Sequence, residues 1–167
     1  MIARAKLTLA AGVIAFGWSC NPVLTDQINA LQGDAPGVRN GPLHRPGEPC
    51  LLCHDGKLTD PNAFSVAGTV YRTASSNEPL PGATILLTGA DGKTHEATTN
   101  EAGNFYLTPN QFVPKSPFRV SVSSGGTTVT MASHIGWNGA CAGCHTDPAG
   151  PESAGHVYFE IGDGGTP

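Results

Sequence analysis

The sequence has few aromatic or charged residues and lacks any extended basic run. Aromatic residues make up 7% of the 167 residues and charged residues 13%, with a net charge of -4. Nucleic acid is therefore not an expected partner, because phosphate binding needs clustered lysine and arginine. No apolar run is long enough to span a bilayer comfortably. The apolar share of 39% is modest. A chain of this size is therefore expected to need further stabilisation of its core, for example by a bound cofactor.

Residues 1–20 have the layout of a secretory signal peptide. Arg4 and Lys6 precede an apolar stretch, which is the charged-then-apolar order of such signals. Cys20 follows a small residue at its end and resembles the lipidated cysteine of bacterial lipoproteins, with ordinary cleavage near Gly17 as the alternative. We therefore expect an exported bacterial protein that is periplasmic, extracellular or anchored at the outer membrane. A membrane is an expected partner only through a lipid on Cys20.

Four of the five cysteines form two CxxC pairs, each followed directly by histidine. The two motifs are Cys50, Cys53 and His54, and Cys141, Cys144 and His145. Cysteines at this spacing form thioethers with the two vinyl groups along one haem edge, and the adjacent histidine ligates the iron. The motifs therefore predict two covalently bound haem c groups, with His54 and His145 as the proximal iron ligands.

Paired cysteines have three other common uses. A single zinc site with four thiolates is disfavoured by the 87 residues between the pairs and by the histidine after each pair. A thioredoxin-like redox pair opens a helix in a βαβ unit, which the sequence does not indicate. A disulfide within one CxxC closes only a tiny loop. Free thiols tend to be oxidised outside the cytoplasm. If Cys20 is lipidated and the other four cysteines bind haem, every cysteine of the exported chain has a role.

Candidates for the second axial position are the four other histidines and Met131, the only methionine after the initiator. His44 and His134 precede the two motifs by six and seven residues across short glycine-containing loops. We expect these two to be the distal ligands, each to its own haem or to the other. His156 is the reserve ligand, ahead of His95, which lies in an expected exposed strand. Bis-His ligation of both irons would lower their potentials relative to methionine ligation.

The stretch between the motifs has the pattern of an all-β domain. The chain holds 22 Gly and 14 Pro, and here they separate short runs of alternating apolar residues. The expected strands cover residues 66–71, 81–87, 103–107, 118–122 and 127–131. Short strands divided by such turns predict a mainly β fold, a Greek-key β-sandwich, flanked by irregular haem-binding segments with short helices.

Three segments of this stretch resemble the carboxypeptidase regulatory-like domain: residues 66–70, 81–85 and 99–106. The resemblance implies a seven-stranded, transthyretin-like sandwich that serves as a structural or interaction module and is not itself catalytic. The CxxCH motifs are similar to those of multihaem cytochromes c, a likeness that covers the motifs alone. The expected order is a signal peptide of lipoprotein type (1–20), a first haem-binding segment (21–64), the sandwich (65–133) and a second haem-binding segment (134–167).

Two haems with both axial positions filled predict an electron carrier, not an enzyme. The expected function is a dihaem c-type cytochrome in extracytoplasmic electron transfer, with redox proteins or neighbouring copies of itself as partners. Stacked copies, with His95 or His156 donated across the boundary, would form an extracellular filament. One alternative is a small haem enzyme that reduces peroxide or a nitrogen oxide at an open axial site. Another is a haem-bearing sensor or adhesion module.

Overall fold

The structure is a computed structural model, and one part of the predicted organisation falls outside what it describes. The described residues are 29–31, 33, 37–56, 62–146, 151 and 153–160. The predicted signal peptide and the proposed lipidation site Cys20 lie outside them. Within these ranges, no helix combines the length and apolarity needed to cross a membrane.

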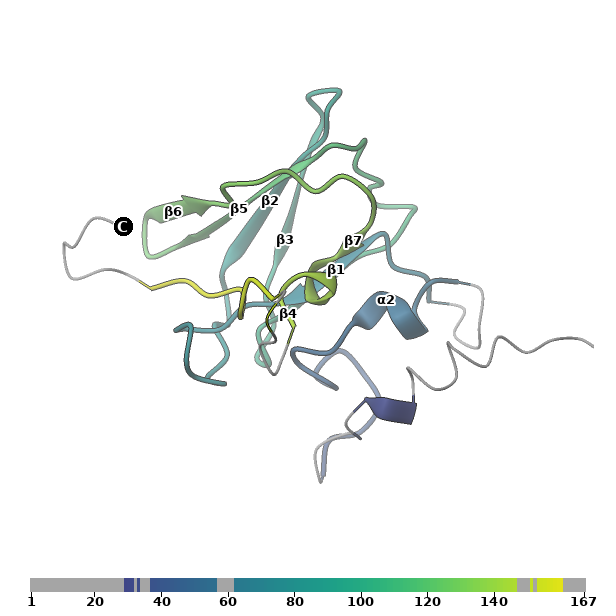
Figure 1. Cartoon of the computed structure of the whole chain (residues 1–167), viewed down its shortest axis with the longest axis vertical. Coiled ribbons are helices and arrows are strands. Elements are labelled where there is room, and N and C mark those ends of the chain that lie inside the picture. Colours follow the sequence, from purple (N-terminus) through teal and green to yellow (C-terminus); the bar gives the residue numbers. More distant parts are fainter. Residues whose placement is uncertain are drawn as a thin grey trace, which may run out of the picture.

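The described residues confirm the predicted mainly β fold. They form seven strands in two sheets, one short helix and one 3-10 turn (Figure 1). The strands are β1 (Val66–Thr69), β2 (Thr84–Thr88), β3 (Thr94–Thr98), β4 (Asn104–Leu107), β5 (Arg119–Ser124), β6 (Thr127–Thr130) and β7 (Gly139–Ala140). One sheet has the order β4-β1-β7 and the other the order β3-β2-β5-β6. The chain leaves the second sheet after β3, crosses to β4 and returns at β5 beside β2.

The four-stranded sheet buries one face because its apolar residues alternate with polar ones. Ile85 and Leu87 of β2 are fully buried, and Val120 and Val122 of β5 face the same core. Ile85 lies opposite Val122 in the antiparallel register, so their side chains share a face. This face forms one wall of the core between the two sheets.

Strand β1 is buried along its whole length and separates two different environments. Val66 belongs to the core between the sheets, and a side chain at Gly68 would contact Phe105 on that same face. Thr69 points to the opposite face, where its hydroxyl accepts a hydrogen bond of 2.8 Å from the amide of Gly47. Successive side chains of a strand alternate between faces, so β1 serves the core on one side and the chain before it on the other.

The chain after residue 133 completes the sandwich. Ile135 exchanges two backbone hydrogen bonds, of 3.0 and 2.9 Å, with Phe118, and β7 pairs in parallel with β1. Gly139 permits this pairing, because a Cβ there would overlap the carbonyl oxygen of Ser65 and lie 2.6 Å from the Cα of Val66. Cys141 follows β7 directly and is thereby placed at the edge of the three-stranded sheet.

Candidate functional site

Each CxxCH motif lines its own pocket. The first pocket has a volume of about 640 Å³ and includes Cys50, Cys53 and His54. The second has a volume of about 530 Å³ and includes Cys141, Cys144 and His145. We call them the outer-face pocket and the inter-sheet pocket, because the first lies against the outward side chains of β4 and the second between the two sheets. Both volumes are within the range of about 300–1,000 Å³ typical of cofactor sites.

A single helical turn presents the first motif to the outer-face pocket. Helix α2 (Cys50–Cys53) packs against β1 and β7, and the amide of His54 donates to the carbonyl of Cys50 over 2.9 Å. Residues three and four apart on a helix lie on one face. The turn therefore brings Cys50, Cys53 and His54 to the same side of the chain.

The ring of His54 is held in a defined orientation. Its Nδ1 lies 3.1 Å from the carbonyl oxygen of Asn62, so Nδ1 carries the proton and Nε2 the lone pair. The imidazole stacks on Phe64 with a centroid distance of 4.3 Å, and Phe64 stacks on Tyr106 at 4.6 Å. A carbonyl-bound Nδ1 with Nε2 as the ligating atom is the usual arrangement of a metal-binding histidine.

The structure brings His44, the predicted distal ligand, to the same pocket. Its ring centroid lies 5.9 Å from that of His54. Two imidazoles bound to one metal ion through bonds of about 2 Å have centroids roughly 6 Å apart. The Nδ1 of His44 also contacts a backbone carbonyl, that of Gly41. The separation and the tautomer of this pair would allow both Nε2 atoms to hold one metal ion.

The loop that carries His44 is bound to the sandwich by Asn104, a residue for which the sequence predicts no role. The Asn104 amide donates to the carbonyl oxygens of Pro42 and His44, over 3.2 and 3.1 Å. Its Oδ1 accepts a 2.7 Å hydrogen bond from Thr69, and the residue is 7% exposed. The only sequence signal was an asparagine where a strand was expected, since asparagine is depleted in strands.

The second motif enters the inter-sheet pocket through the 3-10 turn η1 (Cys141–Gly143). Cys141 packs on β1 at Gly68, where a Cβ would lie 2.8 Å from that of Cys141. The amide of His145 donates to the carbonyl of Cys141 over 2.9 Å, and its Nδ1 lies 2.8 Å from the carbonyl oxygen of Gly155. His145 therefore repeats the arrangement of His54, with the lone pair on Nε2.

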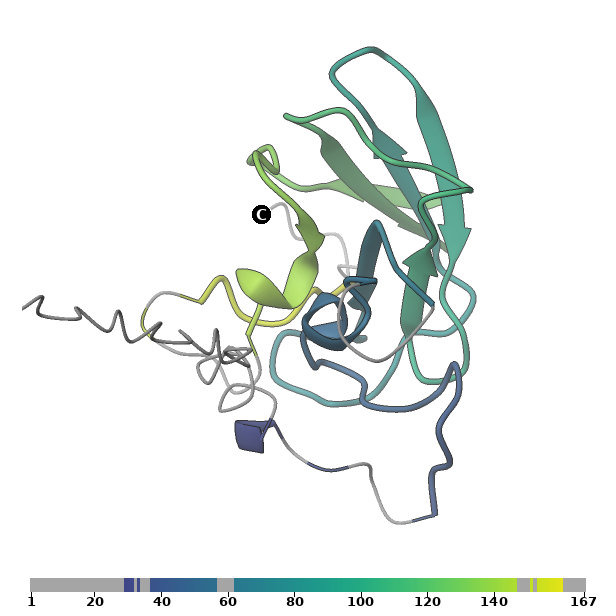
Figure 2. The ribbon, with the colours of Figure 1, turned by 90° about the vertical axis from the view of Figure 1, so that its right-hand side faces the viewer.

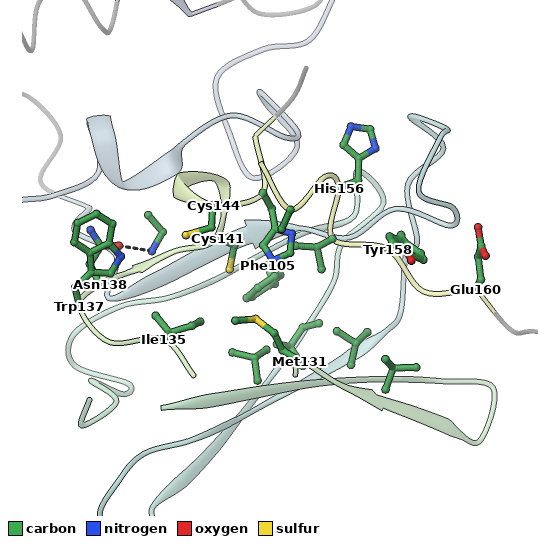
Figure 3. A pocket seen from close by; sticks show the side chains of 18 residues that line it. Phe105, Met131, Ile135, Trp137, Asn138, Cys141, Cys144, His156, Tyr158 and Glu160 are labelled. Carbon is green, nitrogen blue, oxygen red and sulfur yellow. Dashed lines mark hydrogen bonds between the residues drawn. The ribbon is translucent and has the colours of Figure 1, made fainter. Parts of the chain in front are cut away.

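The inter-sheet pocket has an apolar lining that continues to the surface (Figure 3). Buried residues of the four-stranded sheet, including Ile85 and Val122, form its floor. Val129, Trp137 and Tyr158 line it while 47%, 76% and 44% exposed. Contiguous exposed apolar side chains mark binding surfaces in folded proteins. A large apolar ligand seated here would cover all three.

The other histidines proposed as axial ligands are placed differently. His134 is exposed, and its Nε2 accepts a hydrogen bond of 2.9 Å from Arg119, whose side chain points to the outer face of the four-stranded sheet. It is not among the residues that line either pocket. His156 lines the inter-sheet pocket, but its ring stacks on Tyr71 at 4.3 Å. His95 lies in β3, outside both linings.

The two cysteine pairs lie close to each other although 87 residues separate them in sequence. Figures 1 and 2 show α2 and η1 side by side against β1. Burial raises the pKa of Cys50 to about 11. Burial also raises the pKa of Cys141 to about 12, and the nearby thiol of Cys50 adds to the effect. Both thiols are therefore neutral at pH 7, unlike the thiolate of a catalytic redox pair.

The part of the chain that the structure describes contains neither a disulfide nor a clustered metal site. The four cysteines there are not joined by disulfides. Among the same described residues, no three His, Cys, Asp or Glu side chains are grouped as ligands of a metal ion. Each CxxC pair instead belongs to its own pocket, with one histidine beside it.

The two packed sheets and their Greek-key crossover define a β-sandwich domain. The carboxypeptidase regulatory-like domain is the family whose model matches, over residues 65–138. The chain therefore contains a carboxypeptidase regulatory-like domain, as the sequence resemblance predicted. Both CxxCH motifs lie outside the matched residues. No curated protein and no solved structure matches the chain.

Proposed function

We propose that this chain is a dihaem c-type cytochrome that transfers electrons outside the cytoplasm, with one covalent haem c in each pocket. The proposal rests on one observation. Each CxxCH motif lines a pocket large enough for a cofactor, and the Nδ1 of its histidine lies within hydrogen-bond distance of a backbone carbonyl oxygen. Bound haem would supply a one-electron iron couple.

The residues of both pockets fit such a group. Cysteines three residues apart on one turn present two thiols along one edge, and the four described cysteines are free thiols, the form that adds across a vinyl group. The apolar linings, with the exposed Tyr106, Trp137 and Tyr158, suit a large flat apolar body. The buried cofactor would also stabilise a core of this modest size.

In the outer-face pocket, His54 and His44 are the axial ligands. The carbonyl oxygens of Asn62 and Gly41 fix their tautomers, and such outer partners raise the basicity of a ligating imidazole. With both axial positions taken by protein nitrogen, no position remains for a substrate. The site therefore favours a carrier over the alternative of a haem enzyme.

In the inter-sheet pocket, His145 is the proximal ligand and Gly155 its outer partner. The spacing of His134 predicted a distal ligand, but His134 does not line this pocket. Its Nε2 accepts a hydrogen bond from Arg119. His156 lines the pocket and stays the reserve among the histidines.

The chain's own contribution to electron transfer is the close placement of two sites. Phe105 lines both pockets, and Cys50 lies near Cys141. Redox proteins or neighbouring copies of the chain, end to end in a filament, would be the exchange partners. The signal-like residues 1–20 support export, and a lipid on Cys20 would place the protein at the outer membrane.

Electron exchange with a soluble carrier tests this function. The haem-loaded protein is reduced, freed of reductant and mixed with an oxidised soluble cytochrome in a stopped-flow spectrometer. We expect rapid oxidation with about two electrons released per chain, one per haem. Rapid binding of carbon monoxide to the outer-face haem, with turnover of peroxide or nitrite, would contradict the carrier function and support the enzyme.

A further inference from the structure

We propose that Met131 supplies the second axial ligand in the inter-sheet pocket, so that the two haem sites are chemically different. The inference rests on the proposed function. It assigns a His44–His54 pair to the outer-face pocket and a His145–Met131 pair to the inter-sheet pocket.

Strand register places the Met131 side chain in the pocket. Val129 of β6 lies opposite Val122 of β5, and the amide of Met131 donates to the carbonyl of Val120 over 3.0 Å. Alternate residues of an extended segment face the same side. Because Val120 and Val122 face the pocket, Val129 and Met131 face it as well, and all four line it.

The proximal histidine and Met131 come from opposite walls of the pocket. His145 follows η1, which packs on β1 of the three-stranded sheet. Met131 extends β6 of the four-stranded sheet. Figure 3 shows the Met131 thioether turned toward the side of the pocket that carries Cys141. Because they come from different walls of the pocket, His145 and Met131 would hold a bound group between them.

The competing histidine is directed elsewhere. Figure 3 shows the ring of His156 pointing away from Cys141 and Met131, and its stacking partner Tyr71 is not among the pocket-lining residues. His156 therefore contributes to the rim of the pocket, and Met131 is the donor that faces its interior.

The assignment makes the two sites unequal in reduction potential. A thioether favours ferrous iron more than an imidazole does, so His–Met ligation raises the potential above that of a bis-His site. The apolar walls around Ile85 and Val122 act in the same direction, because they disfavour the extra charge of ferric iron. Electrons would therefore reside first in the inter-sheet pocket and reach it from the outer-face pocket.

Methionine labelling tests the assignment. The sequence contains two methionines, Met1 and Met131, so protein labelled with [methyl-13C]methionine gives a nearly unambiguous spectrum. We expect one methyl signal far upfield in the reduced protein, moved by the ring current of the haem that it ligates. The ferric protein should show the weak sulfur-to-iron band at the red end of its spectrum.

Variants separate ligation from packing. Met131→Leu should lose both signals while two haems stay covalently attached, and Met131→His should stay low-spin and lower only the higher of the two potentials. His134→Ala is the control, because His134 lies outside both pocket linings, and it should keep both signals.

Two haems by mass with the Met131 methyl at its ordinary shift would overturn this assignment alone. A chain that carries no haem on Cys141 and Cys144 would overturn the proposed function as well.

Discussion

Three histidines share one arrangement, in which Nδ1 meets a backbone carbonyl oxygen. The pairs are His44 with Gly41, His54 with Asn62, and His145 with Gly155. A carbonyl accepts only from a protonated nitrogen, so each contact assigns the lone pair to Nε2. This shared tautomer distinguishes the proposed ligands from His134, whose Nε2 accepts hydrogen bonds from Arg119.

Replacing two histidines one at a time tests these roles. His44→Ala should convert one of the two haems from low-spin to high-spin iron, because the outer-face site loses an axial nitrogen. His134→Ala should leave both haems low-spin, because His134 lies outside both pocket linings. Electron paramagnetic resonance of the ferric protein counts the two spin states. The opposite pattern, with His134→Ala creating the high-spin haem, would reject the placement of His44.

Asn104 should act as a positioning residue for His44. Asn104→Asp keeps the shape of the side chain but removes the two N–H bonds to Pro42 and His44. A lost hydrogen bond at a buried site costs about 1–3 kcal/mol, which should free the loop and give a fraction of high-spin outer-face haem that grows with temperature. Variable-temperature absorbance of the ferric protein measures that fraction.

The matched control for Asn104→Asp makes the same chemical change at an exposed position. Asn77→Asp lies on the surface, away from both pocket linings, and should keep the wild-type spin state at every temperature. If Asn104→Asp also keeps it, the tie between the sandwich and the His44 loop has no role in ligation.

The placement of single side chains was predictable where it depends on local spacing. The two CxxCH motifs and the short loop before Cys50 are local patterns, and the structure places His44 beside His54. The similar spacing of His134 did not carry over, because Ile135 pairs with Phe118 and holds that loop at the edge of the other sheet. The role of Asn104 depends on a partner 60 residues away, which no local pattern contains.

Among the elements, strand β1 organises both sites. It contacts both α2 and η1, and Gly68 lets Cys141 approach its backbone. Its parallel pairing with β7 leads directly into the second motif. A change in this pairing should therefore affect both the stability of the sandwich and the attachment of the second haem.

Gly139→Ala tests the β1–β7 pairing. The added methyl group would overlap the carbonyl oxygen of Ser65 and crowd Val66. Overpacking of this kind costs typically about 1–3 kcal/mol, so the midpoint of denaturant unfolding should fall and the axial ligation of the haem on Cys141 and Cys144 should be lost first. Gly136→Ala is the control, since a Cβ there has no neighbour within 4 Å. Equal midpoints for the two variants would contradict the tight pairing.

The longer strands were predictable and β7 was not. Alternating residues such as Ile85 and Leu87 signal a half-buried strand from the sequence alone. Strand β7 has only two residues and pairs in parallel with β1, more than 70 residues earlier. Two residues are too few to show an alternation of apolar and polar side chains. Neither strand β7 nor its pairing with β1 could therefore be predicted from the sequence.

Over the whole molecule, the sandwich brings together two motifs that lie far apart in sequence. Composition and turn residues predicted a mainly β domain between two irregular segments. They could not predict that both segments pack on one strand, because that arrangement depends on which face of β1 each segment covers. The proposed pair of redox sites depends on the resulting adjacency of Cys50 and Cys141.

The central claim is that both CxxCH motifs carry covalent haem. The most direct test is the intact mass of the protein after export from a bacterium that matures c-type cytochromes, followed by mapping of its haem peptides. We predict the mass of the mature chain plus two haems, with one haem on Cys50 and Cys53 and the other on Cys141 and Cys144. A mass without haem, with four thiols that alkylate or bind zinc, would contradict the account.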